Sequence, residues 1–331
     1  MTKVAINGLG RIGRAALKII LETEGLDLVA VNDIVPPDNL AYMLKYDSVY
    51  GRYNKEVQVS GDELKIDGHS IKVLNVKNPE ELPWDDMQVQ TVIESTGIFT
   101  KPDELEKHIK AGAKGVILSA PVKGEGVDMV VHGVNTPEGQ KVISCASCTT
   151  NCITPVVEVL DRRIGIKKAN MTTIHAYTSS QSIVDGPNKK WRRGRAGALN
   201  FVPTTTGAAT ATTKTLPQMQ GKFDGVAIRG PVPVGSVADL NFVTAKPTSV
   251  EEVNQIFKEE AESERYNGIL GVSDDHIVSS DIIQDSRASI VDLTMTQVVD
   301  GDLLKVMSWY DNEWGYAAQM IRELQRMAKE S

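Results

Sequence analysis

The feature that most restricts the fold is a glycine-rich turn between a short apolar strand and a helix near the amino terminus. Val4–Ile6 has the β-branched, apolar character of a buried strand, and the pattern of residues 15–21 predicts a helix with a wide apolar face. A second apolar segment, residues 26–32, predicts the next strand and is followed by Asp33. Strand, turn, helix and strand together predict a βαβ unit with parallel strands.

The turn has the GxGxxG spacing of dinucleotide-binding sites, formed by Gly8, Gly10 and Gly13. Glycines let the backbone approach a pyrophosphate, which would lie at the amino end of the helix. Asp33 stands where an acidic residue accepts hydrogen bonds from the adenine ribose hydroxyls, and its charge disfavours a 2′-phosphate. The sequence therefore favours NAD as the cofactor, with NADP as the alternative. Because glycine is common, a glycine turn without a ligand is the other interpretation.

The distribution of predicted elements indicates two domains and an α/β fold. Strand-like and helical segments alternate up to about residue 150, which predicts a parallel, Rossmann-type sheet covered on both faces. Alternating strand-like runs then predominate, which predicts an α+β domain with a mostly antiparallel sheet and a few helices on one face. We expect an NAD-binding domain over residues 1–147 and a catalytic domain over residues 148–313. A helix over residues 314–331 is expected to pack back on the first domain, and residues 178–200 are expected to form a long loop.

Length and composition exclude several classes of protein. A chain of 331 residues is longer than one domain with a single hydrophobic core usually is, so two domains are expected. Its net charge of −7 gives no general attraction to nucleic acid or anionic membranes. We find no apolar run of about 18 residues that would span a membrane, and the first apolar run is too short for a signal peptide. The basic run Lys189–Arg195 is short and isolated, so we interpret it as a solvated loop and subunit contact, with nucleic acid binding as a lesser alternative.

All three cysteines, Cys145, Cys148 and Cys152, lie in the segment SCASCTTNC. Their crowding argues against a disulfide framework and for a reducing compartment, so the expected location is the cytoplasm. A tetrahedral zinc site or an iron–sulfur cluster needs four ligands, and no fourth cysteine exists, so no metal is expected. The polar residues around Cys148 predict a helix start, where the helix dipole and a nearby imidazolium would favour a thiolate. Burial of all three as small core residues is the alternative.

His175 is the candidate partner of a reactive thiol among the five histidines. It ends a strand-like run and precedes a polar loop, which is where a strand delivers a catalytic side chain. His69 lies in a polar turn and His108 on a strongly charged helical segment, so both are expected at the surface.

Motifs along nearly the whole chain resemble the phosphorylating glyceraldehyde-3-phosphate dehydrogenase family. They are AINGLGRIGR (5–14), VND (31–33), LKYDSVYGRY (44–53), ESTGIFT (94–100), ASCTTNC (146–152), TIHAYT (173–178), PTTTGAA (203–209) and SWYDNEWGY (308–316). ASCTTNC together with DNEWGY is far more specific than the glycine motif.

The resemblance implies roles for individual residues. Cys148 matches the nucleophile, His175 the base, Asn312 the residue that orients the nicotinamide carboxamide, and Tyr316 a residue beside the ring. Further matches to the cofactor site are Gly8, Gly10, Arg11, Ile12, Gly13, Asp33, Thr96 and Ser119. The pocket for the phosphate of the substrate is matched by Thr178 and Arg229, and the pocket for inorganic phosphate by Ser147, Thr149, Arg195, Thr206 and Gly207.

The implied reaction oxidises glyceraldehyde 3-phosphate to 1,3-bisphosphoglycerate with NAD and inorganic phosphate. The thiolate of Cys148 adds to the aldehyde, His175 takes the hydroxyl proton as hydride leaves, and phosphate attacks the resulting thioester. The resemblance also implies a homotetramer in which the 178–200 loop packs beside the cofactor of a neighbouring subunit. The alternatives are erythrose-4-phosphate dehydrogenase and an NADP-preferring, gluconeogenic variant; the intact TTTG (204–207) favours an inorganic-phosphate pocket.

The sequence departs from the family pattern near the phosphate pockets. Ser180 stands where the family often has an acid, which leaves Arg229 with one fewer neighbour to hold it. Gly230 follows Arg229 where RVPTP-like runs are usual, and residues 185–196 form a segment about one residue short. Pro187 matches the NAD-using pattern and agrees with Asp33.

Overall fold

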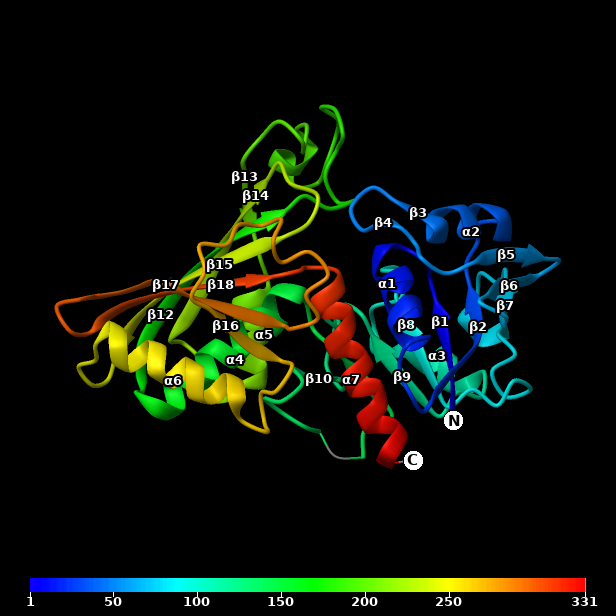
Figure 1. Ribbon diagram of the computed structural model, residues 1–331. Helices are drawn as coiled ribbons and strands as arrows, with labels where there is room; N and C mark the ends of the chain where they lie inside the picture. The colour runs from blue at the N-terminus through cyan, green and yellow to red at the C-terminus, as the bar shows by residue number, and fades with distance from the viewer. Residues whose placement is uncertain (138, 331) are drawn as a thin grey trace. The chain divides into compact units, whose positions relative to one another are not determined.

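The computed structural model describes residues 1–137 and 139–330, which form two compact units. The first unit comprises Met1–Val130, Pro137–Ala146 and the residues from Met320 onward, and the second comprises Val131–Thr136 and Ser147–Gln319. Each unit is built on its own large sheet (Figure 1). The predicted α/β class, with one parallel-sheet part and one mostly antiparallel part, is confirmed.

The first unit contains a nine-stranded sheet in the order β10-β11-β9-β8-β1-β2-β7-β6-β5. Its strands are β1 (Thr2–Asn7), β2 (Leu26–Asn32), β5 (Val57–Ser60), β6 (Glu63–Ile66), β7 (His69–Leu74), β8 (Thr91–Glu94), β9 (Gly115–Leu118), β10 (Asp128–Met129) and β11 (Val142–Ser144). The strands from β10 to β7 pair in parallel, and β6 and β5 extend the sheet in antiparallel fashion. Every residue of β8 and β9 is buried, which requires cover on both faces of the sheet.

The helices of the first unit follow the predicted alternation. They are α1 (Arg11–Ile20), α2 (Pro37–Lys45), α3 (Pro102–Lys110) and the 3₁₀ helix η1 (Pro79–Glu81), with a hairpin of β3 (Tyr46–Asp47) and β4 (Gly51–Arg52) after α2. The apolar pattern predicted a helix from residue 15, but helix α1 begins at Arg11 and so includes Gly13. Helix α7 (Trp314–Glu330) contributes its residues from Met320 onward to this unit, and Ser331 of the predicted helix lies outside the described residues.

The prediction that His108 lies at the surface is wrong. His108 is fully buried on α3, on the same face as Leu105, three residues earlier. Its ring nitrogens contact Trp84 and Glu94, which are also fully buried. The charged residues of α3 occupy the opposite face, so the composition of the helix hid a buried, hydrogen-bonded histidine.

The second unit contains a seven-stranded sheet in the order β13-β14-β12-β15-β18-β17-β16. Its strands are β12 (Ile166–Ala176), β13 (Val202–Thr205), β14 (Phe223–Gly230), β15 (Ser236–Thr244), β16 (Leu270–Ser273), β17 (Ser289–Val299) and β18 (Leu303–Tyr310). Only the β12–β14 and β16–β17 pairs are parallel among the described strands of this sheet. Alternate residues of β15 are fully buried, which is the period of a strand that packs one face on a core.

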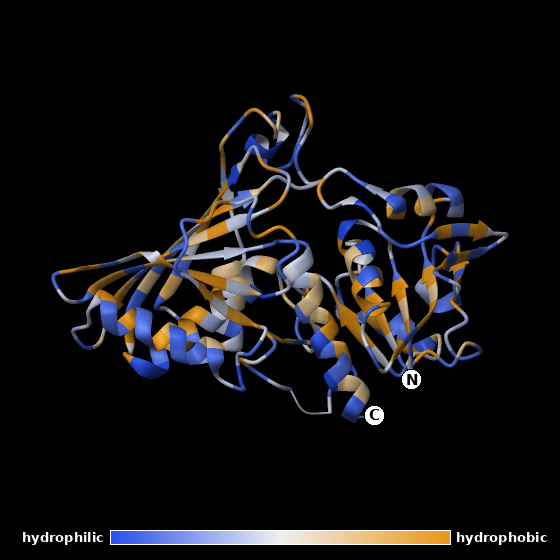
Figure 2. Ribbon diagram, viewed as in Figure 1, coloured by the Kyte–Doolittle hydropathy of each residue, from blue (hydrophilic) through white to orange (hydrophobic). Residues whose placement is uncertain are grey.

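Three helices pack on one face of this sheet: α4 (Cys148–Arg163), α5 (Ala208–Thr215) and α6 (Val250–Glu262) (Figure 1). Their apolar side chains and those of the strands form one core, and Figure 2 shows the apolar residues concentrated along the strands and the inner sides of the helices. Residues 178–200 form the predicted long loop, which is interrupted by the 3₁₀ helix η2 (Trp191–Gly194). The remaining 3₁₀ helix of the unit is η3 (Pro217–Met219). Within residues 1–137 and 139–330, no helix has the length and apolar character needed to cross a bilayer.

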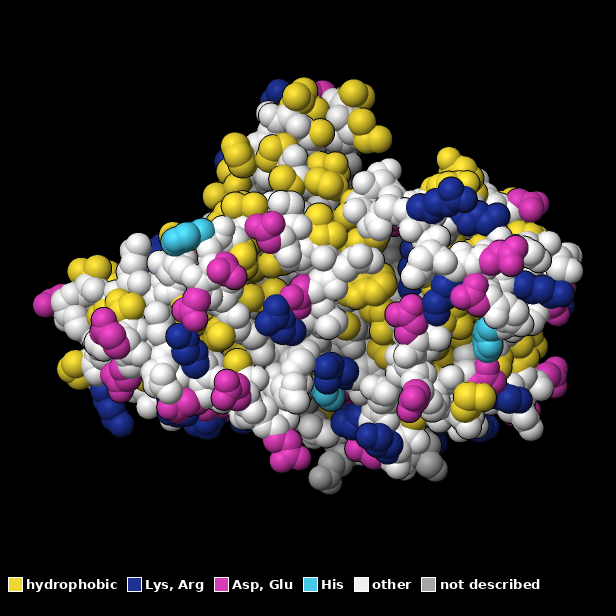
Figure 3. All heavy atoms as spheres, in the orientation of Figure 1, with side chains coloured by type: hydrophobic (Ala, Val, Ile, Leu, Met, Phe, Trp, Pro, Cys, Tyr) yellow, Lys and Arg dark blue, Asp and Glu magenta, His cyan; other side chains and the backbone are white. Residues whose placement is uncertain are grey.

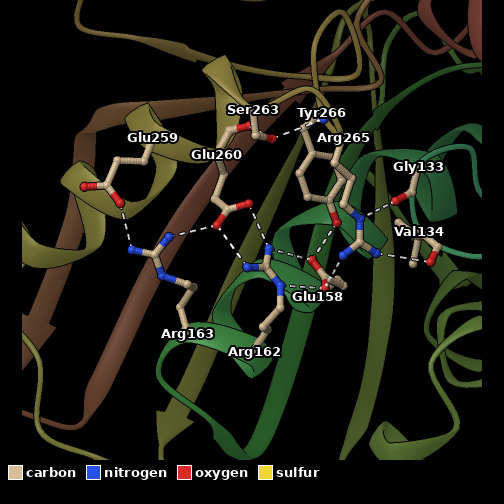
Figure 4. A network of polar contacts seen from close by, with 10 residues as sticks. All are labelled: Gly133, Val134, Glu158, Arg162, Arg163, Glu259, Glu260, Ser263, Arg265 and Tyr266. Atoms are coloured by element: carbon tan, nitrogen blue, oxygen red, sulfur yellow. Dashed lines mark hydrogen bonds and ion pairs between the residues drawn. The ribbon is translucent and has the colours of Figure 1, made fainter.

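A network of ion pairs joins α4 to α6 and to the turn that follows α6 (Figure 4). Arg162 donates hydrogen bonds to Glu158 on its own helix (2.9 Å) and to Glu260 on α6 (2.8 Å). Glu158 also accepts hydrogen bonds from Arg265 (2.9 Å) and from the hydroxyl of Tyr266 (2.6 Å). Burial raises the pKa of the Glu158 carboxyl, but these donors hold it below its usual value, and the hydrogen bond from Arg162 likewise lowers the pKa of Glu260.

This network predicts a loss of stability in acid. Because both carboxyls have folded pKa values below their unfolded values, their contribution is present above about pH 4.3 and is lost as the pH falls through the folded values. The double variant Glu158→Gln/Glu260→Gln should be about 1–2 kcal/mol less stable at pH 7, since solvent screens the partly exposed arginines. It should then lose less stability than the wild type between pH 7 and about pH 3, a range that extends below the unfolded pKa, measured by urea unfolding.

Glu264→Gln is the matched control, because Glu264 is exposed on the same turn. It should leave both the stability at pH 7 and its pH dependence unchanged. An identical pH dependence in the double variant and the wild type would contradict the assignment.

Candidate active site

Helix α4 places Cys148 in its first turn. Ser147 is the N-cap residue, and its Oγ accepts a hydrogen bond from the backbone N–H of Thr150 (3.2 Å), so the predicted helix start is confirmed. The preceding residue, Ala146, has a φ of 53°, a left-handed conformation that costs roughly 1–2 kcal/mol for a residue with a Cβ. The unpaired amides and the dipole at this end of a helix favour negative charge on the cysteine sulfur.

His175 lies beside Cys148 at the end of β12. Its Nε2 is 3.4 Å from the Cys148 Sγ, and its Nδ1 is 2.7 Å from the carbonyl oxygen of Ala176. Nδ1 also lies 3.1 Å from Arg229 Nη1, which can only donate, whereas the Ala176 carbonyl oxygen can only accept. The shorter contact to Ala176 favours the proton on Nδ1, which leaves Nε2 unprotonated and facing the thiol. This tautomer is the one that a general base requires.

Arg229 is held next to His175 by the parallel register of β12 and β14, in which the two residues are partners. Its Nη1 donates to the carbonyl oxygen of Ala176 (3.0 Å) and lies 3.4 Å from the hydroxyl of Thr178. Its Nε is buried and has no hydrogen-bond partner among the residues that the structure describes. Because its closest contacts are neutral oxygen and nitrogen atoms, the charge of this guanidinium is available to an anionic ligand.

The electrostatics of the pair differ from the expected imidazolium. Burial raises the pKa of the Cys148 thiol, and the Arg229 guanidinium opposes this rise. Burial and the same guanidinium lower the pKa of His175 to about 3. These effects favour an uncharged thiol beside an uncharged imidazole, which can accept the thiol proton during attack. Cys148 is the one partly exposed cysteine among the three.

The other two cysteines are buried free thiols, Cys145 at 2% exposure and Cys152 at 0%. Burial raises the pKa of both thiols, to about 12 for Cys152. They therefore behave as small core residues, and the alternative of burial holds for two of the three cysteines. Among the described residues, no group of three His, Cys, Asp or Glu side chains could hold a metal ion.

Tyr310 is a site residue that the sequence reasoning missed. Its buried hydroxyl lies 2.9 Å from the Oγ1 of Thr149 on α4 and 2.8 Å from the Oγ1 of Thr173 on β12. Its ring meets the imidazole of His175 edge-on, with centroids 6.0 Å apart. Thr149, an expected phosphate ligand, thus uses its hydroxyl within the protein. The only signal in the sequence was the place of Tyr310 in SWYDNEWGY.

The structure brings Arg193, and not the expected Arg195, to the residues around the PTTTG segment. Arg193 donates hydrogen bonds to the Oγ1 of Thr204 (3.0 Å), the carbonyl oxygen of Thr205 (3.2 Å) and the Oγ of Ser180 (3.4 Å). Arg195 instead forms an exposed ion pair with Asp185, at 2.7 Å. The η2 turn decides which arginine faces inward, and an irregular turn has no period that a sequence pattern could show.

Other polar residues of this part of the second unit form local hydrogen bonds. The hydroxyls of Thr178 and Ser180 lie 2.9 Å apart, and Lys190 Nζ donates to the Oγ1 of Thr205 (2.8 Å). Gly207 is the N-cap residue of α5, and the Oγ1 of Thr206 accepts a hydrogen bond from the first amide of that helix. Burial lowers the pKa values of Lys190 and Arg193; repulsion from Arg193 and Arg229 lowers that of Lys190 further, and repulsion from Arg229 that of Arg193.

The predicted dinucleotide turn is present in the first unit. A Cβ on Gly8 would lie 2.7 Å from the backbone nitrogen of Thr96, and a Cβ on Gly13 would lie 2.0 Å from the carbonyl oxygen of Gly8. Gly10 is the N-cap residue of α1, and Asp33 Oδ2 accepts a hydrogen bond from the backbone N–H of Leu9 within the turn (2.7 Å). The structure therefore brings the three glycines and Asp33 together.

The other expected cofactor residues fall into two groups. In the first unit, Arg11 forms an ion pair with Asp47 (2.5 Å), Ile12 follows it on α1, and Ser119 donates its backbone N–H to Glu94. In the second unit, the Oδ1 of Asn312 accepts hydrogen bonds from Gly235 N (3.2 Å) and Ser236 Oγ (2.9 Å). Its Nδ2 is thereby oriented as the donor of this amide. Tyr316 is buried in the first turn of α7.

Comparisons with known proteins agree with this geometry. Residues 2–102 match the family model of the glyceraldehyde 3-phosphate dehydrogenase NAD binding domain, and residues 147–312 match that of the C-terminal domain. The chain is 48% identical to glyceraldehyde-3-phosphate dehydrogenase 2 of Streptomyces avermitilis over 324 residues, 96% of each chain. It is 46% identical to the glyceraldehyde-3-phosphate dehydrogenases of Clostridium pasteurianum, over 99% of each chain, and Geobacillus stearothermophilus, over 96% of each chain. This chain therefore belongs to the glyceraldehyde 3-phosphate dehydrogenase family.

Proposed function

We propose that this protein oxidises glyceraldehyde 3-phosphate to 1,3-bisphosphoglycerate with NAD and inorganic phosphate. The observation that carries the proposal is the Cys148 Sγ, 3.4 Å from the unprotonated Nε2 of His175 and beside the anion-binding guanidinium of Arg229. A thiol next to a neutral base suits addition to an aldehyde, and the guanidinium suits a substrate that carries a phosphate. The printed names of the most similar relatives support the same reaction.

The residues would act in a fixed order. Nε2 of His175 takes the thiol proton as the Cys148 sulfur forms a bond to the aldehyde carbon, and the proton then passes to the oxyanion. Nε2 takes it again from the hydroxyl as the hydride leaves that carbon, and a thioester to Cys148 is left. A phosphate oxygen attacks the thioester carbon and the sulfur departs as the thiolate. The backbone amide of Cys148 and His175 are the candidate donors to the oxyanion.

The turn in the first unit fits NAD. The close approaches at Gly8 and Gly13 leave a backbone cradle that any side chain would fill, and such a cradle at a helix amino end suits a pyrophosphate. Asp33 has the charge to accept from the adenine ribose hydroxyls and to repel a 2′-phosphate, so we propose NAD over NADP. Asn312 Nδ2 would donate to the nicotinamide carboxamide. Bound NAD supplies the hydride acceptor.

We assign the two phosphate pockets as follows. Arg229 and Thr178 would hold the phosphate of the substrate, because the Arg229 guanidinium lies within hydrogen-bonding distance of the Thr178 hydroxyl and both residues are near His175. Arg193 would hold inorganic phosphate in place of Arg195, with Ser147, Thr206, Gly207 and the backbone amide of Thr149 at the first turn of α4. This second pocket favours the phosphorylating reaction over erythrose-4-phosphate oxidation.

The surface and the cysteines support two further proposals. The long loop of the second unit exposes large apolar side chains, and Figure 3 shows hydrophobic atoms gathered on it. The exposed fractions are 90% for Ile183, 89% for Trp191 and 83% for Leu199, and Phe201, directly after the loop, is 72% exposed. Apolar exposure on this scale marks an interaction surface, so we propose that the loop packs against other copies in a homotetramer. The three free cysteines support a reducing, cytoplasmic location.

Removal of either catalytic side chain should abolish or greatly slow turnover. We expect no measurable oxidation by Cys148→Ser and a decrease in kcat of about 10²–10⁴-fold for His175→Asn, with NAD binding kept in both. Steady-state rates with glyceraldehyde 3-phosphate and erythrose 4-phosphate, with and without phosphate and with NAD or NADP, test the substrate and cofactor. Oxidation of glyceraldehyde 3-phosphate that does not depend on phosphate would contradict the proposed reaction.

The two arginines of the loop provide a matched test of the inorganic-phosphate pocket. Arg193→Gln should raise the KM for phosphate about 10- to 100-fold, because it removes hydrogen bonds from a charged donor. Arg195→Gln removes the same charge two positions away and should change that KM by less than about twofold. The opposite ranking of the two variants would restore Arg195 as the ligand.

The loop surface should be covered in solution. Light scattering of the wild type should give the mass of a tetramer, and Trp191→Glu should shift the population towards smaller species, because a carboxylate at a buried apolar contact is strongly unfavourable. Lys189→Glu is the control, because it introduces the same carboxylate two residues away at a side chain that is already polar. A monomeric wild type would refute the proposed assembly.

A further inference from the structure

A buried row of polar side chains lies at the carboxyl ends of three neighbouring parallel strands in the first unit. Asn7 ends β1, Asn32 ends β2 and Glu94 ends β8, and the register pairs Asn7 with both of the others. Their exposed fractions are 1%, 4% and 0%. Asn32 Nδ2 donates to Asn7 Oδ1 (2.7 Å), and Asn7 Nδ2 donates to Glu94 Oε2 (2.6 Å). The row is thus one connected chain of hydrogen bonds.

Glu94 is the residue on which this row converges. Its Oε1 accepts hydrogen bonds from the backbone N–H of Thr96 (2.8 Å) and from the Thr96 hydroxyl (2.5 Å). Its Oε2 accepts from Asn7 and lies 3.1 Å from His108 Nε2. A carboxylate with four donors around it is fully satisfied, and loss of one donor in a buried site is costly.

The contact between Glu94 and His108 has a defined direction. The indole N–H of Trp84 can only donate, and its Nε1 lies 3.0 Å from His108 Nδ1, so Nδ1 accepts. A neutral imidazole then carries its proton on Nε2 and donates it to Glu94. Trp84 therefore fixes the tautomer of His108, and His108 fixes the orientation of the carboxylate.

The held carboxylate in turn fixes the backbone against which the dinucleotide turn packs. The Thr96 nitrogen that donates to Glu94 is the atom that a Cβ on Gly8 would meet at 2.7 Å. The neighbouring Ser95 Oγ donates to the carbonyl oxygen of Gly8 (2.7 Å). The position of Gly8 is therefore set by the Ser95–Thr96 turn, which Glu94 holds from the buried side.

We propose that Glu94 and His108 are positioning residues for the cofactor. Both are fully buried, and they act through the Ser95–Thr96 turn to keep the Gly8 backbone where a dinucleotide pyrophosphate binds. The inference rests on the proposed use of NAD. A role in stability alone would change only the unfolding free energy. The proposed role predicts that loss of the contact between Glu94 and His108 also lowers the affinity for NAD.

Two substitutions of His108 separate these roles. A glutamine can donate its amide N–H to Glu94 and accept from Trp84 with its carbonyl oxygen, whereas a leucine of similar size can do neither. Calorimetry should show that His108→Leu raises the Kd for NAD and for ADP-ribose by the same factor, at least about tenfold, because the two ligands share the pyrophosphate. His108→Gln should restore most of the affinity, and Glu94→Gln should weaken it.

Three controls show whether the effect is specific. The rate at which iodoacetamide alkylates Cys148 and the KM for glyceraldehyde 3-phosphate should stay within about twofold in all variants, since these depend on the second unit. Thr91→Val changes a buried polar side chain at the amino end of the same strand, and it should lower Tm without changing the Kd for NAD. Trp84→Phe removes the N–H that fixes the tautomer together with part of a buried ring, so it should lower Tm and also raise the Kd even if His108→Leu fails to fold.

Two outcomes would overturn the proposal. One is a lower Tm with an unchanged Kd for NAD in His108→Leu, Glu94→Gln and Trp84→Phe. The other is an equal increase in Kd from Thr91→Val. Failure of the proposed function is a different result, because the wild type itself would then show no binding of NAD.

Discussion

The hydroxyl of Tyr310 is the contact on which the geometry of the reactive pair depends. It joins Thr149 at the start of α4 to Thr173 near the end of β12, two elements that the chain brings together only through the fold of the second unit. A buried hydroxyl must find partners, so the two short contacts fix the helix end relative to the strand end. Cys148 precedes Thr149 and His175 lies two residues after Thr173, so this link helps to hold the pair, whose Sγ and Nε2 are 3.4 Å apart.

Arg229 connects the reactive pair to the anion-binding residues. The strand register that places it beside His175 also turns its guanidinium towards Thr178, so one cation serves two purposes. Burial and, to a smaller extent, this guanidinium lower the pKa of His175, which keeps the imidazole uncharged and able to accept a proton. The guanidinium also opposes the effect of burial on the pKa of the Cys148 thiol. With Ser180 in place of the acid that is frequent in the family, the nearest side-chain neighbour of Thr178 is a neutral hydroxyl. The positive charges of Arg229 and Arg193 therefore stay available for the two phosphates of the proposed reaction.

The sequence predicted those parts of the fold and site that depend on a regular period or on backbone chemistry. The bounds of β2, the glycine turn beside Asp33 and the start of α4 at Cys148 follow from apolar periodicity and from local hydrogen bonding. The side chains that it misplaced depend on orientation and on distant partners. Arg193 and Arg195 are equally basic, and only the η2 turn separates them. His108 has charged neighbours in sequence, but Trp84 and Glu94 satisfy its ring in the core.

In both units, buried polar side chains with all their hydrogen bonds made fix the backbone that lies next to the site. In the second unit Tyr310 does this for the end of α4, and in the first unit Glu94 does it for the turn that packs on Gly8. A satisfied polar group in a core is directional, whereas an apolar contact of the same area permits sliding and repacking. A nucleophile, a base and a pyrophosphate cradle each need positions defined to a fraction of an ångström, and the cost of burying polar atoms beneath them is the physical means by which such positions are kept.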